Sequence, residues 1–524
     1  MVGVTTTTNH IMRLSKLTSS NSSTCLSKSY RCFSAALSSS SSSSTVLPKM
    51  TSATTVPDKM LLTPTLYAND TNKNGSKRMA HTAIGDNNRV YTAGSGIGTD
   101  SSMIAANDRH NLHNLFAKPK ANFTTSASSS PAATSKAGEG GMDDEYGEMT
   151  SDGSTYYHPE PYTLENGHIL ENAQVRYMTY GTLNEERDNV IVVCHALTGN
   201  ASLHSWWGDL LGPNQAFDTS RYFIVCANIL GSCYGSTSPS SPKPSSEKEI
   251  YGMDFPDISI QDTVRMQLLL LRDELQVQSI KCVIGGSFGG MQAVEYAAQA
   301  GSVDSEFAVN DKHDQAKPFV RTVLPIACGA SHTAWQIAIS EVQRQAIYAD
   351  PKWNNGNPSP DDPPLAGLSV ARQIGMVSYR TSMGYEKKFG RKVRNAATDD
   401  DAPPPSYGSQ APWEVKSYLI YQGTKFLSRF DPVTYIKLTE QMDTHDVGRN
   451  RGGKEKALRN VHIPALVLGI DSDVLYPLHE QKELVSLFPN AELKVIHSEA
   501  GHDGFLLEQD QVASYITGFL EAHD

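Results

Sequence analysis

The sequence predicts an α/β fold with a mostly parallel central sheet, flanking helices and a helical insertion. Nearly continuous apolar, β-branched-rich runs fit strands that are buried on both faces. Helical patterns lie between these runs, as strand–helix–strand repetition in an open sheet requires. The predicted strands are NVIVVCHAL (189–197), RYFIVCANIL (221–230), SIKCVIGGS (279–287), FVRTVLPIACG (319–329), IPALVLGID (463–471) and AELKVIHSE (491–499). The predicted helices between them are DTVRMQLLLLRDEL (262–275), GGMQAVEYAAQA (289–300) and PLHEQKELVSLF (477–488).

Residues 1–150 precede this pattern and are low in sequence complexity. Runs such as AALSSSSSSSTV (35–46) and TTSASSSPAATSKAGEGG (124–141) contain too little apolar surface to offset the ordering of their backbone. We therefore predict that residues 1–150 are mostly disordered and that residues 151–524 form the globular domain.

The start of the chain also has the composition of a transit peptide. No Asp or Glu occurs before Asp58, and Arg13, Lys16, Lys28 and Arg31 are scattered among Ser and Thr. The segment RCFSAA (31–36) resembles a mitochondrial processing site that is cleaved before Ser34. A solvated tail on a cytoplasmic protein explains the same composition, so the predicted location is cytoplasmic or mitochondrial.

One interval, about 330–455, interrupts the strand–helix alternation and predicts a helical lid over the sheet. Its helical patterns are HTAWQIAISEVQRQAI (332–347), LAGLSVARQIGMVSYRT (365–381), VKSYLIYQGTKFL (415–427) and DPVTYIKLTEQM (431–442). The polar stretch 394–412 is predicted to be a loop within this insertion. The stretch 304–318 is predicted to be a surface loop before a strand.

Composition excludes several classes of function. A formal net charge of -11 argues against a general nucleic-acid binder. The sequence contains no apolar run of about 18 residues, so we expect no membrane span. The seven cysteines form no CxxC pair and lie largely in apolar runs, which favours a reducing compartment without disulfides. No metal-binding motif is present, and we predict no metal site.

The segment Gly285-Gly286-Ser287-Phe288-Gly289 predicts a nucleophilic serine. It fits G-x-S-x-G between a predicted strand and a predicted helix, which is the context of a nucleophile elbow. Glycines relieve the collisions that side chains would cause in so sharp a turn. The hydroxyl of Ser287 is then exposed above a helix N-terminus, whose N–H groups stabilise an anion. An incidental serine in a glycine-rich turn is the alternative.

A serine hydroxyl needs a base, and in an elbow fold the order along the chain is Ser, acid, His. Asp471 and Asp473 directly follow one predicted strand, and His497 and His502 follow the next. We predict Asp473 as the acid and His502 as the base. Asp471 competes with Asp473, and its alternative role is a turn or cap carboxylate. His497, at a strand end, is predicted to be structural.

The oxyanion hole requires two N–H groups. One is predicted to be the backbone N–H of Phe288, the residue after the nucleophile. The other is predicted to be the backbone N–H of Leu197, in the loop after the first predicted strand. A lone histidine in such a loop is more often structural than catalytic, so we predict a structural role for His195, in the same loop.

Eight blocks of the chain resemble the homoserine O-acetyltransferase family, of the fungal type. They occur in order over about 155–524: NVIVVCHALTGNASLHSWWGDLLGP, NILGSCYGSTSPSS, VIGGSFGGMQ, GLSVARQIGMVSYRT, SYLIYQGTKFLSRFD, DTHDVGR, DSDVLYP and GHDGFL. The resemblance implies an α/β-hydrolase fold that performs acyl transfer, with Ser287, Asp473 and His502 as its triad.

The resemblance also assigns substrate-binding residues. Arg372 and Asp503 fall on positions that hold the amino-acid substrate, and Tyr379 falls on a tyrosine that lines the same pocket. An arginine grips a carboxylate through two hydrogen bonds, and an aspartate accepts from an ammonium group. The alternative roles are an ion pair within the insertion for Arg372 and a helix cap for Asp503.

The implied reaction is a ping-pong transfer that belongs to methionine biosynthesis. Ser287 attacks the thioester of acetyl-CoA, and the acetyl-serine is then attacked by the hydroxyl of L-homoserine. The resemblance implies no permanently bound cofactor, acetyl-CoA as co-substrate and a homodimer formed through the helical insertion.

Two departures from the family pattern bear on the substrates. The usual G-S-T-G-P reads Gly235-Ser236-Thr237-Ser238-Pro239, which leaves the acyl donor open between acetyl and succinyl. The stretch NNGNPSP (354–360) replaces one that commonly carries a tyrosine. The rival functions are serine O-acetyl- or O-succinyltransferase, an esterase or thioesterase, and a catalytically silent binding protein.

Overall fold

A computed structural model describes residues 153–393 and 413–524, and these residues confirm the predicted α/β fold. The predicted disorder of residues 1–150, the transit-peptide hypothesis and the loop 394–412 lie outside the described residues. No helix in the described part of the chain is long and apolar enough to cross a membrane.

The central sheet of the described residues has eight strands in the order β1-β4-β6-β5-β9-β12-β13-β14. All six predicted strands belong to it and pair in parallel. They are β5 (Val190–Cys194), β6 (Phe223–Ala227), β9 (Ile280–Gly286), β12 (Val323–Ile326), β13 (Ala465–Ile470) and β14 (Ala491–Ile496). Every residue of β5, β9, β12 and β13 is buried, as the continuous apolar runs predict.

The sequence did not predict the antiparallel edge of this sheet. Strand β1 (Ser154–Tyr157) pairs with β4 (Gln174–Tyr180), which pairs with β6. Buried and more exposed residues alternate along most of β4, so its sequence lacks an apolar run. The remaining strands form short hairpins: β2 (Tyr162–Thr163) with β3 (Ile169–Leu170), β7 (Pro242–Lys243) with β8 (Ser246–Ile250), and β10 (Val309–Asn310) with β11 (Ala316–Lys317). The predicted surface loop 304–318 therefore contains a hairpin.

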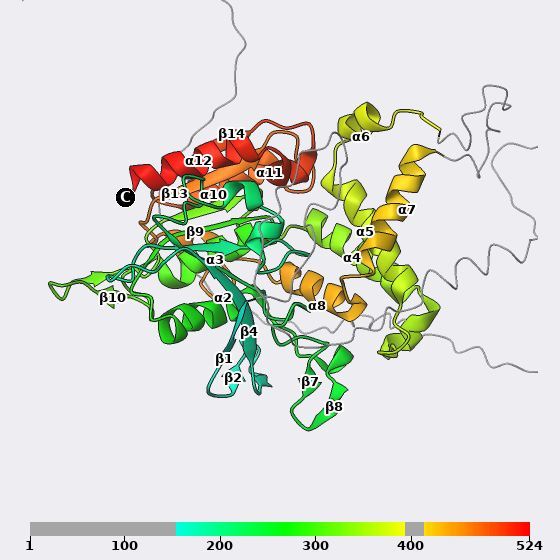
Figure 1. Cartoon of the computed structure of the whole chain (residues 1–524), viewed down its shortest axis with the longest axis horizontal. Helices are drawn as coiled ribbons and strands as arrows, with labels where there is room; N and C mark the ends of the chain where they lie inside the picture. Colours follow the sequence, from blue (N-terminus) through cyan, green and yellow to red (C-terminus); the bar gives the residue numbers. More distant parts are fainter. Residues whose placement is uncertain (1–152, 394–412) are drawn as a thin grey trace, which may run out of the picture. The chain divides into compact units, whose positions relative to one another are not determined.

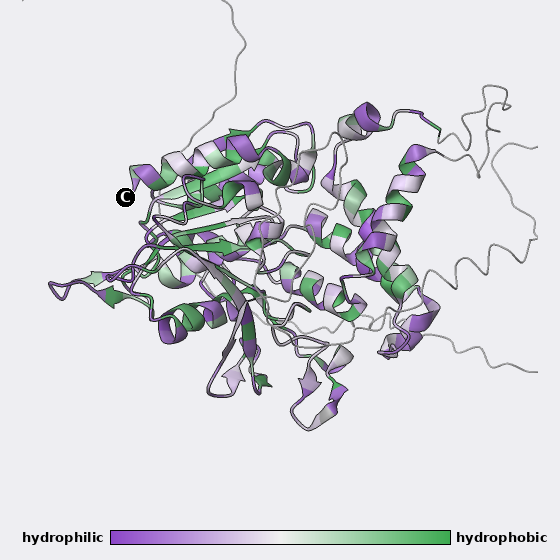
Figure 2. Ribbon diagram, viewed as in Figure 1, coloured by the Kyte–Doolittle hydropathy of each residue, from purple (hydrophilic) through white to green (hydrophobic). Residues whose placement is uncertain are grey.

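Helices cover both faces of the sheet, as Figure 1 shows, with α2 and α3 on one side and α12 on the other. Alternate strand residues belong to separate cores: Val190 and Val192 to one, Ile191 and Val193 to the other. The central strands of the sheet are accordingly mostly hydrophobic in Figure 2, whereas many helices have one polar face. The flanking helices are α2 (Ile260–Leu269), which continues as a π-helical turn (Leu270–Glu274), α3 (Phe288–Ala300), α9 (Lys454–Leu458), α10 (Leu478–Leu487), α11 (Gly504–Leu507) and α12 (Gln509–Ala522).

A set of helices lies between β12 and β13 in the chain and to one side of the sheet (Figure 1). They are α4 (Ala334–Tyr348), α5 (Leu365–Tyr379), α6 (Ser382–Lys388), α7 (Glu414–Phe426) and α8 (Pro432–Asp443). Helix α5 packs against α4, α7 and α8. We call α4 to α8 the lid. Short 3-10 turns complete the described structure: η1 (Leu203–Ser205), η2 (Gly208–Leu210), η3 (Gly252–Asp254), η5 (Pro351–Gly356) and η6 (Gly501–Asp503).

The turn between β9 and α3 requires glycine for close packing. Ser287 itself has φ 58° and ψ −121°, a backbone conformation that is strained for a residue with a side chain. A Cβ atom on Gly289 would lie 2.0 Å from the carbonyl oxygen of Cys194, at the end of β5. A Cβ atom on Gly285 would lie 2.4 Å from the carbonyl oxygen of Gly289. The two glycines thus let α3 start directly against the sheet.

This packing predicts that Gly289→Ala strongly destabilises the fold. The added methyl group would overlap backbone atoms of Cys194, and no side-chain rotation can relieve that overlap. The free energy of unfolding should therefore fall by at least about 3 kcal/mol. Urea unfolding followed by circular dichroism measures this change. The matched control is Gly518→Ala, because a Cβ at that position inside α12 meets nothing within 4 Å. Its effect should be neutral or stabilising, within about 1 kcal/mol. Equal stability of the two variants would show that the turn does not require a glycine at position 289.

Candidate active site

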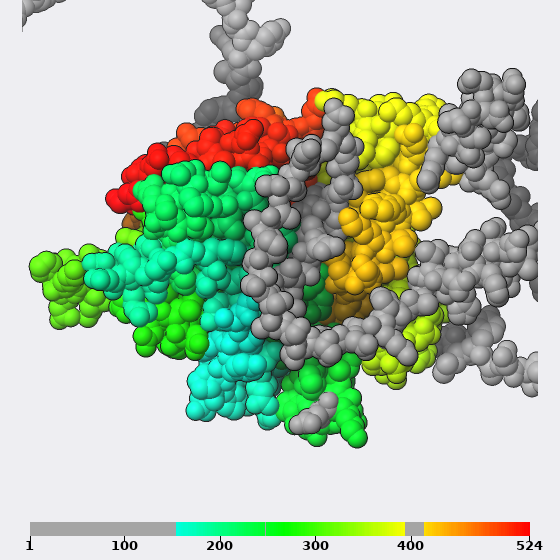
Figure 3. Space-filling model, viewed as in Figure 1, coloured from blue at the N-terminus to red at the C-terminus, as the bar shows by residue number. Residues whose placement is uncertain are grey.

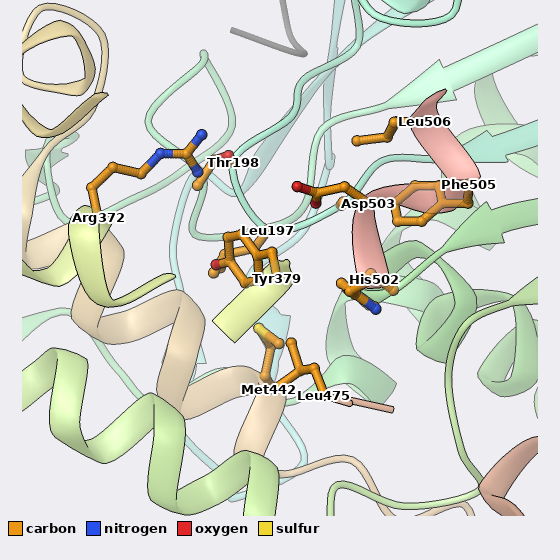
Figure 4. Close-up of a pocket in the computed structure, with 12 residues that line it drawn as sticks. Leu197, Thr198, Arg372, Tyr379, Met442, Leu475, His502, Asp503, Phe505 and Leu506 are labelled. Carbon is orange, nitrogen blue, oxygen red and sulfur yellow. The ribbon is translucent and has the colours of Figure 1, made fainter. Parts of the chain in front are cut away.

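The structure brings most of the predicted site residues to one cavity. The space between its lining residues, which is partly open to solvent, has a volume of about 440 Å³. The cavity is lined by Ala196, Leu197, Thr198, Ser287, Arg372, Tyr379, Met442, Leu475, His502, Asp503, Phe505 and Leu506. Figure 4 shows Arg372 on one side of this space, with His502, Asp503 and Phe505 on the other. The cavity therefore lies between the carboxyl ends of the strands and the lid.

Ser287 is the N-cap residue of α3, but its side chain does not cap the helix. Its backbone N–H instead donates to the carbonyl of Ile326, at the end of the neighbouring strand β12, at 2.9 Å. That bond helps to hold the strained turn, and the residue, which lines the cavity, is 7% exposed. The turn thus fixes the hydroxyl at the edge of the sheet, and the hydroxyl makes no capping hydrogen bond to α3.

Asp473 and His502 form a buried pair. Oδ2 of Asp473 lies 2.7 Å from Nδ1 of His502, and their side chains are 0% and 4% exposed. Oδ1 of Asp473 accepts from the backbone N–H groups of Leu475 and Tyr476, both at 2.8 Å. With three hydrogen bonds, the carboxylate is well solvated by the protein and can hold the imidazole in one orientation.

The competing pair lies elsewhere. Asp471 contacts Nδ1 of His497 at 2.8 Å, and these side chains are 41% and 75% exposed. Neither residue lines the cavity. Asp471 also accepts from the N–H of Ser498, so it stabilises the turn after β14.

His502 is enclosed by aromatic rings. The ring centres of Tyr476, Phe505 and Tyr379 lie 5.0, 5.7 and 6.2 Å from its own. Its Nε2 atom is buried, and no group of the described residues hydrogen-bonds to it. A serine–histidine bond at an active site often tightens only when substrate binds. The arrangement therefore leaves Nε2 available for proton transfer in the cavity that Ser287 also lines.

The two predicted oxyanion donors differ in their surroundings. Leu197 lines the cavity, in the loop after β5. The side chain of Phe288 is 0% exposed in the core and does not line the cavity, while its backbone opens the first turn of α3. Backbone N–H groups at a helix N-terminus favour negative charge.

His195 anchors the loop that carries Leu197. Its Nδ1 atom lies 2.8 Å from the carbonyl of Ala196, and its Nε2 atom accepts from the N–H of Ile229 at 3.1 Å. Burial lowers the pKa of His195 to about 4, so the ring is neutral at pH 7 and can use one nitrogen as donor and the other as acceptor. This is the structural role that the sequence favoured.

Arg372 and Tyr379 reach the cavity from α5. The guanidinium of Arg372 lies 5.2 Å from the ring centre of Phe426, and the residue is only 4% exposed. An aromatic face supports a planar cation without neutralising it. Tyr379 folds back over Gly375, where a Cβ atom would lie 3.0 Å from the tyrosine hydroxyl. It also interacts with the hydroxyl of Tyr435, whose pKa is raised by burial.

Asp503 has a partner that the sequence did not predict. Nε of Arg380 lies 2.5 Å from Oδ2 of Asp503, and the side chains are 4% and 5% exposed. Asp503 does not cap α11 with its side chain. The sequence shows that Arg380 directly follows Tyr379, but nothing in the sequence indicates that its ion-pair partner is Asp503. Asp503 is thus half of a buried ion pair, with Arg372 across the same cavity (Figure 4).

The departures from the family pattern lie outside the cavity wall. Ser238 is buried, and its N–H donates to the hydroxyl of Ser241 at 3.0 Å. Asn354 and Asn355 adopt left-handed backbone conformations near the end of η5. None of the three is among the lining residues.

Comparison with known proteins places this geometry in context. A family model described as alpha/beta hydrolase fold matches residues 189–509. The homoserine O-acetyltransferase of Salinibacter ruber (strain DSM 13855 / M31) is 46% identical over 355 residues, which cover 68% of this chain and 94% of that protein. The homoserine O-acetyltransferase of Trichormus variabilis (strain ATCC 29413 / PCC 7937) is 42% identical over 378 residues, or 72% and 96% of the two chains.

Solved structures agree with the fold. The homoserine O-acetyltransferase from Bacillus anthracis matches with a TM-score of 0.60 at 24% identity, over 70% of this chain and 96% of that one. Esterase E22 matches with a TM-score of 0.59 at 22% identity, over 70% and 99%. One architecture thus serves a transferase and an esterase, and at this identity these two structures support the fold alone.

Proposed function

The chain belongs to the homoserine O-acetyltransferase family of α/β-hydrolases, and we propose that it transfers an acetyl group from acetyl-CoA to the hydroxyl of L-homoserine. The observation that carries this proposal is the Asp473–His502 pair in contact with a cavity that Ser287, Arg372 and Asp503 also line. The cavity combines the groups for acyl transfer with charges of both signs for a zwitterionic acceptor. In this role the enzyme acts in methionine biosynthesis.

In the first half-reaction, Nε2 of His502 takes the proton of Ser287, and the serine oxygen attacks the thioester carbonyl. Asp473 stabilises the imidazolium that forms. The N–H groups of Leu197 and Phe288 hold the negative oxygen of the tetrahedral intermediate, a contribution of about 3 kcal/mol per donor in comparable sites. The thioester bond breaks, the thiol leaves with the proton from His502, and an acetyl-serine remains.

In the second half-reaction, His502 deprotonates the acceptor hydroxyl, whose oxygen attacks the acetyl-serine carbonyl. The bond between the acetyl group and the Ser287 oxygen then breaks, and that oxygen regains the proton from His502. Arg372 is the group suited to the acceptor carboxylate, because its guanidinium offers two parallel donors. Asp503 is suited to the ammonium group, and Arg380 holds that carboxylate in place. Fixing both ends of the acceptor puts its hydroxyl next to the acyl group at a high effective concentration.

Transfer must outcompete hydrolysis of the acetyl-serine. Apolar side chains of Met442, Leu475, Phe505 and Leu506 line much of the cavity, and the lid contributes Met442. Such a wall offers few hydrogen bonds to water while the charged groups select the acceptor. The acetyl donor enters as a co-substrate, and the mechanism uses no permanently bound cofactor.

A homodimer formed through the lid is part of the proposal. Val370 and Val377 on α5 are 47% and 54% exposed, and Ile420 and Tyr421 on α7 are 60% and 50% exposed. Figure 3 shows α7 at the surface. Exposed apolar side chains on adjacent helices favour association between subunits.

Sedimentation equilibrium should give twice the monomer mass, and Ile420→Asp should shift the protein to monomers. A monomeric native protein would contradict the proposed dimer.

Rapid mixing with acetyl-CoA alone should release a burst of about one CoA per active site, because acylation is complete before water removes the acetyl group. Adding L-homoserine should then restore steady turnover. Stopped-flow detection of the free thiol measures both phases.

Ser287→Ala should abolish the burst and the turnover. Continuous CoA release without any acceptor would contradict the proposal and indicate an esterase or thioesterase. A preference for serine over homoserine, or for succinyl-CoA over acetyl-CoA, would overturn the substrate assignment.

Arg372→Lys should separate the two half-reactions. Lysine keeps the charge but loses the two-donor geometry, so kcat/KM for L-homoserine should fall by about 10- to 100-fold. The rate constant of the acetyl-CoA burst should stay close to the native value, since the acceptor is absent from that step. Single-turnover kinetics of each step provide the measurement. Equal losses in both half-reactions would show that Arg372 does not act on the acceptor specifically.

A further inference from the structure

The first turn of lid helix α4 and His332, just before its N-cap, hydrogen-bond to three successive residues of the loop that carries Asp473. Residues 473–476 are here called the acid loop, and His332, Trp335 and Gln336 the acid-loop clamp. Nε1 of Trp335 donates to the carbonyl of Val474 at 2.9 Å, and Nε2 of Gln336 donates to the carbonyl of Leu475 at 2.7 Å. Nε2 of His332 lies 3.0 Å from the hydroxyl of Tyr476.

Gln336 is held in one orientation by its own helix. Thr333, the N-cap of α4, donates both its N–H, at 2.6 Å, and its hydroxyl to Oε1 of Gln336. The amide Nε2 must then point the other way, toward the carbonyl of Leu475 and the buried carboxylate of Glu480, which it contacts at 2.9 and 3.1 Å. Gln336 is 1% exposed, so these bonds have little competition from water.

Gln336 is linked to the triad acid, Asp473, through the backbone of Leu475. Leu475 accepts from Gln336 through its carbonyl and donates to Oδ1 of Asp473 through its N–H. The N–H of Tyr476 donates to the same oxygen. Because the peptide groups of the acid loop are planar, fixing the Leu475 carbonyl also fixes the plane of the Tyr476 N–H.

His332 supports the other end of the loop. Its Nδ1 atom lies 3.1 Å from Oδ1 of Asp443, whose Oδ2 accepts from Nη2 of Arg344 at 2.7 Å. Tyr476, held by His332, has its ring 5.0 Å from that of His502. Asp473 thus contacts Leu475, which Gln336 of the lid holds, and His502 contacts Tyr476, which His332 holds.

We infer that the acid-loop clamp positions Asp473, and that Gln336 is its main positioning residue. This inference rests on the proposed function, because it assigns a purpose to the orientation of the triad acid. Gln336 does not line the cavity and so contacts no substrate. Gln336 fixes the backbone of Leu475, which orients Asp473, and Asp473 orients His502. Both half-reactions use the Asp473–His502 pair.

The test is Gln336→Met in the full-length enzyme, with the burst assay on acetyl-CoA followed by L-homoserine. The rate constants of acylation and of transfer should both fall by about 10- to 100-fold, as expected when a catalytic group is displaced by a fraction of an ångström to one ångström. The burst amplitude, corrected for folded protein by circular dichroism, should stay near one CoA per site. The KM for L-homoserine should change little.

The matched control is Gln299→Met. Gln299, at the far end of α3 from Ser287, also makes two side-chain hydrogen bonds, to the carbonyl of Gln261 at 3.0 Å and to Glu295 at 2.7 Å. Its variant should keep native rate constants. Trp335→Phe provides a second variant if Gln336→Met does not fold, because Trp335 is 52% exposed and the change removes only its N–H donor. Its two rate constants should fall together, by a smaller factor.

Native rate constants in both Gln336→Met and Trp335→Phe, with only the fraction of folded protein reduced, would overturn the inference and assign the clamp to stability alone. Loss of the transfer step without loss of acylation would overturn it as well, since the acid serves both steps. A native enzyme that shows no burst would instead contradict the proposed function.

Discussion

The strained backbone at Ser287 is the constraint on which the rest of the site depends. A positive φ at a residue with a side chain persists only where the surroundings enforce it. Here β9, α3 and the neighbouring strands β5 and β12 do so together, through glycines that admit close contact and a bond from the Ser287 N–H to Ile326. The turn places a hydroxyl, a helix N-terminus and the loop after β5 at one edge of the sheet.

In the proposed mechanism, residues that follow the strands supply the reactive groups, and residues on or next to the lid helix α5 select the acceptor. Ser287, Asp473 and His502 all follow strands, whereas Arg372 and Tyr379 lie on α5 and Arg380 directly follows it. The buried ion pair of Arg380 and Asp503 links the two parts. A buried charge that lost its partner would be costly, so this pair also favours a single placement of the lid against the triad loop.

Sequence alone predicted the six parallel strands, most of them because continuous apolar runs indicate burial on both faces; the edge strand β14 is only partly buried. It missed β1 and β4, whose polar residues alternate with buried ones at the sheet edge. The order Ser, acid, His identified Asp473 as a candidate, but only the fold separates it from Asp471, two residues away, which meets exposed His497. Arg380 and Gln336 escaped prediction because their partners lie more than a hundred residues away in the chain.

The central claim is that an acetyl group passes through Ser287, and peptide mass spectrometry after acid quenching tests it most directly. The enzyme is mixed with acetyl-CoA without acceptor, quenched within the burst and digested. The account predicts one added acetyl group on the peptide that contains Ser287, lost when L-homoserine is added before the quench and absent from Ser287→Ala. An unmodified Ser287 during full turnover, or acetyl on another residue that is discharged by L-homoserine at the catalytic rate, would contradict it.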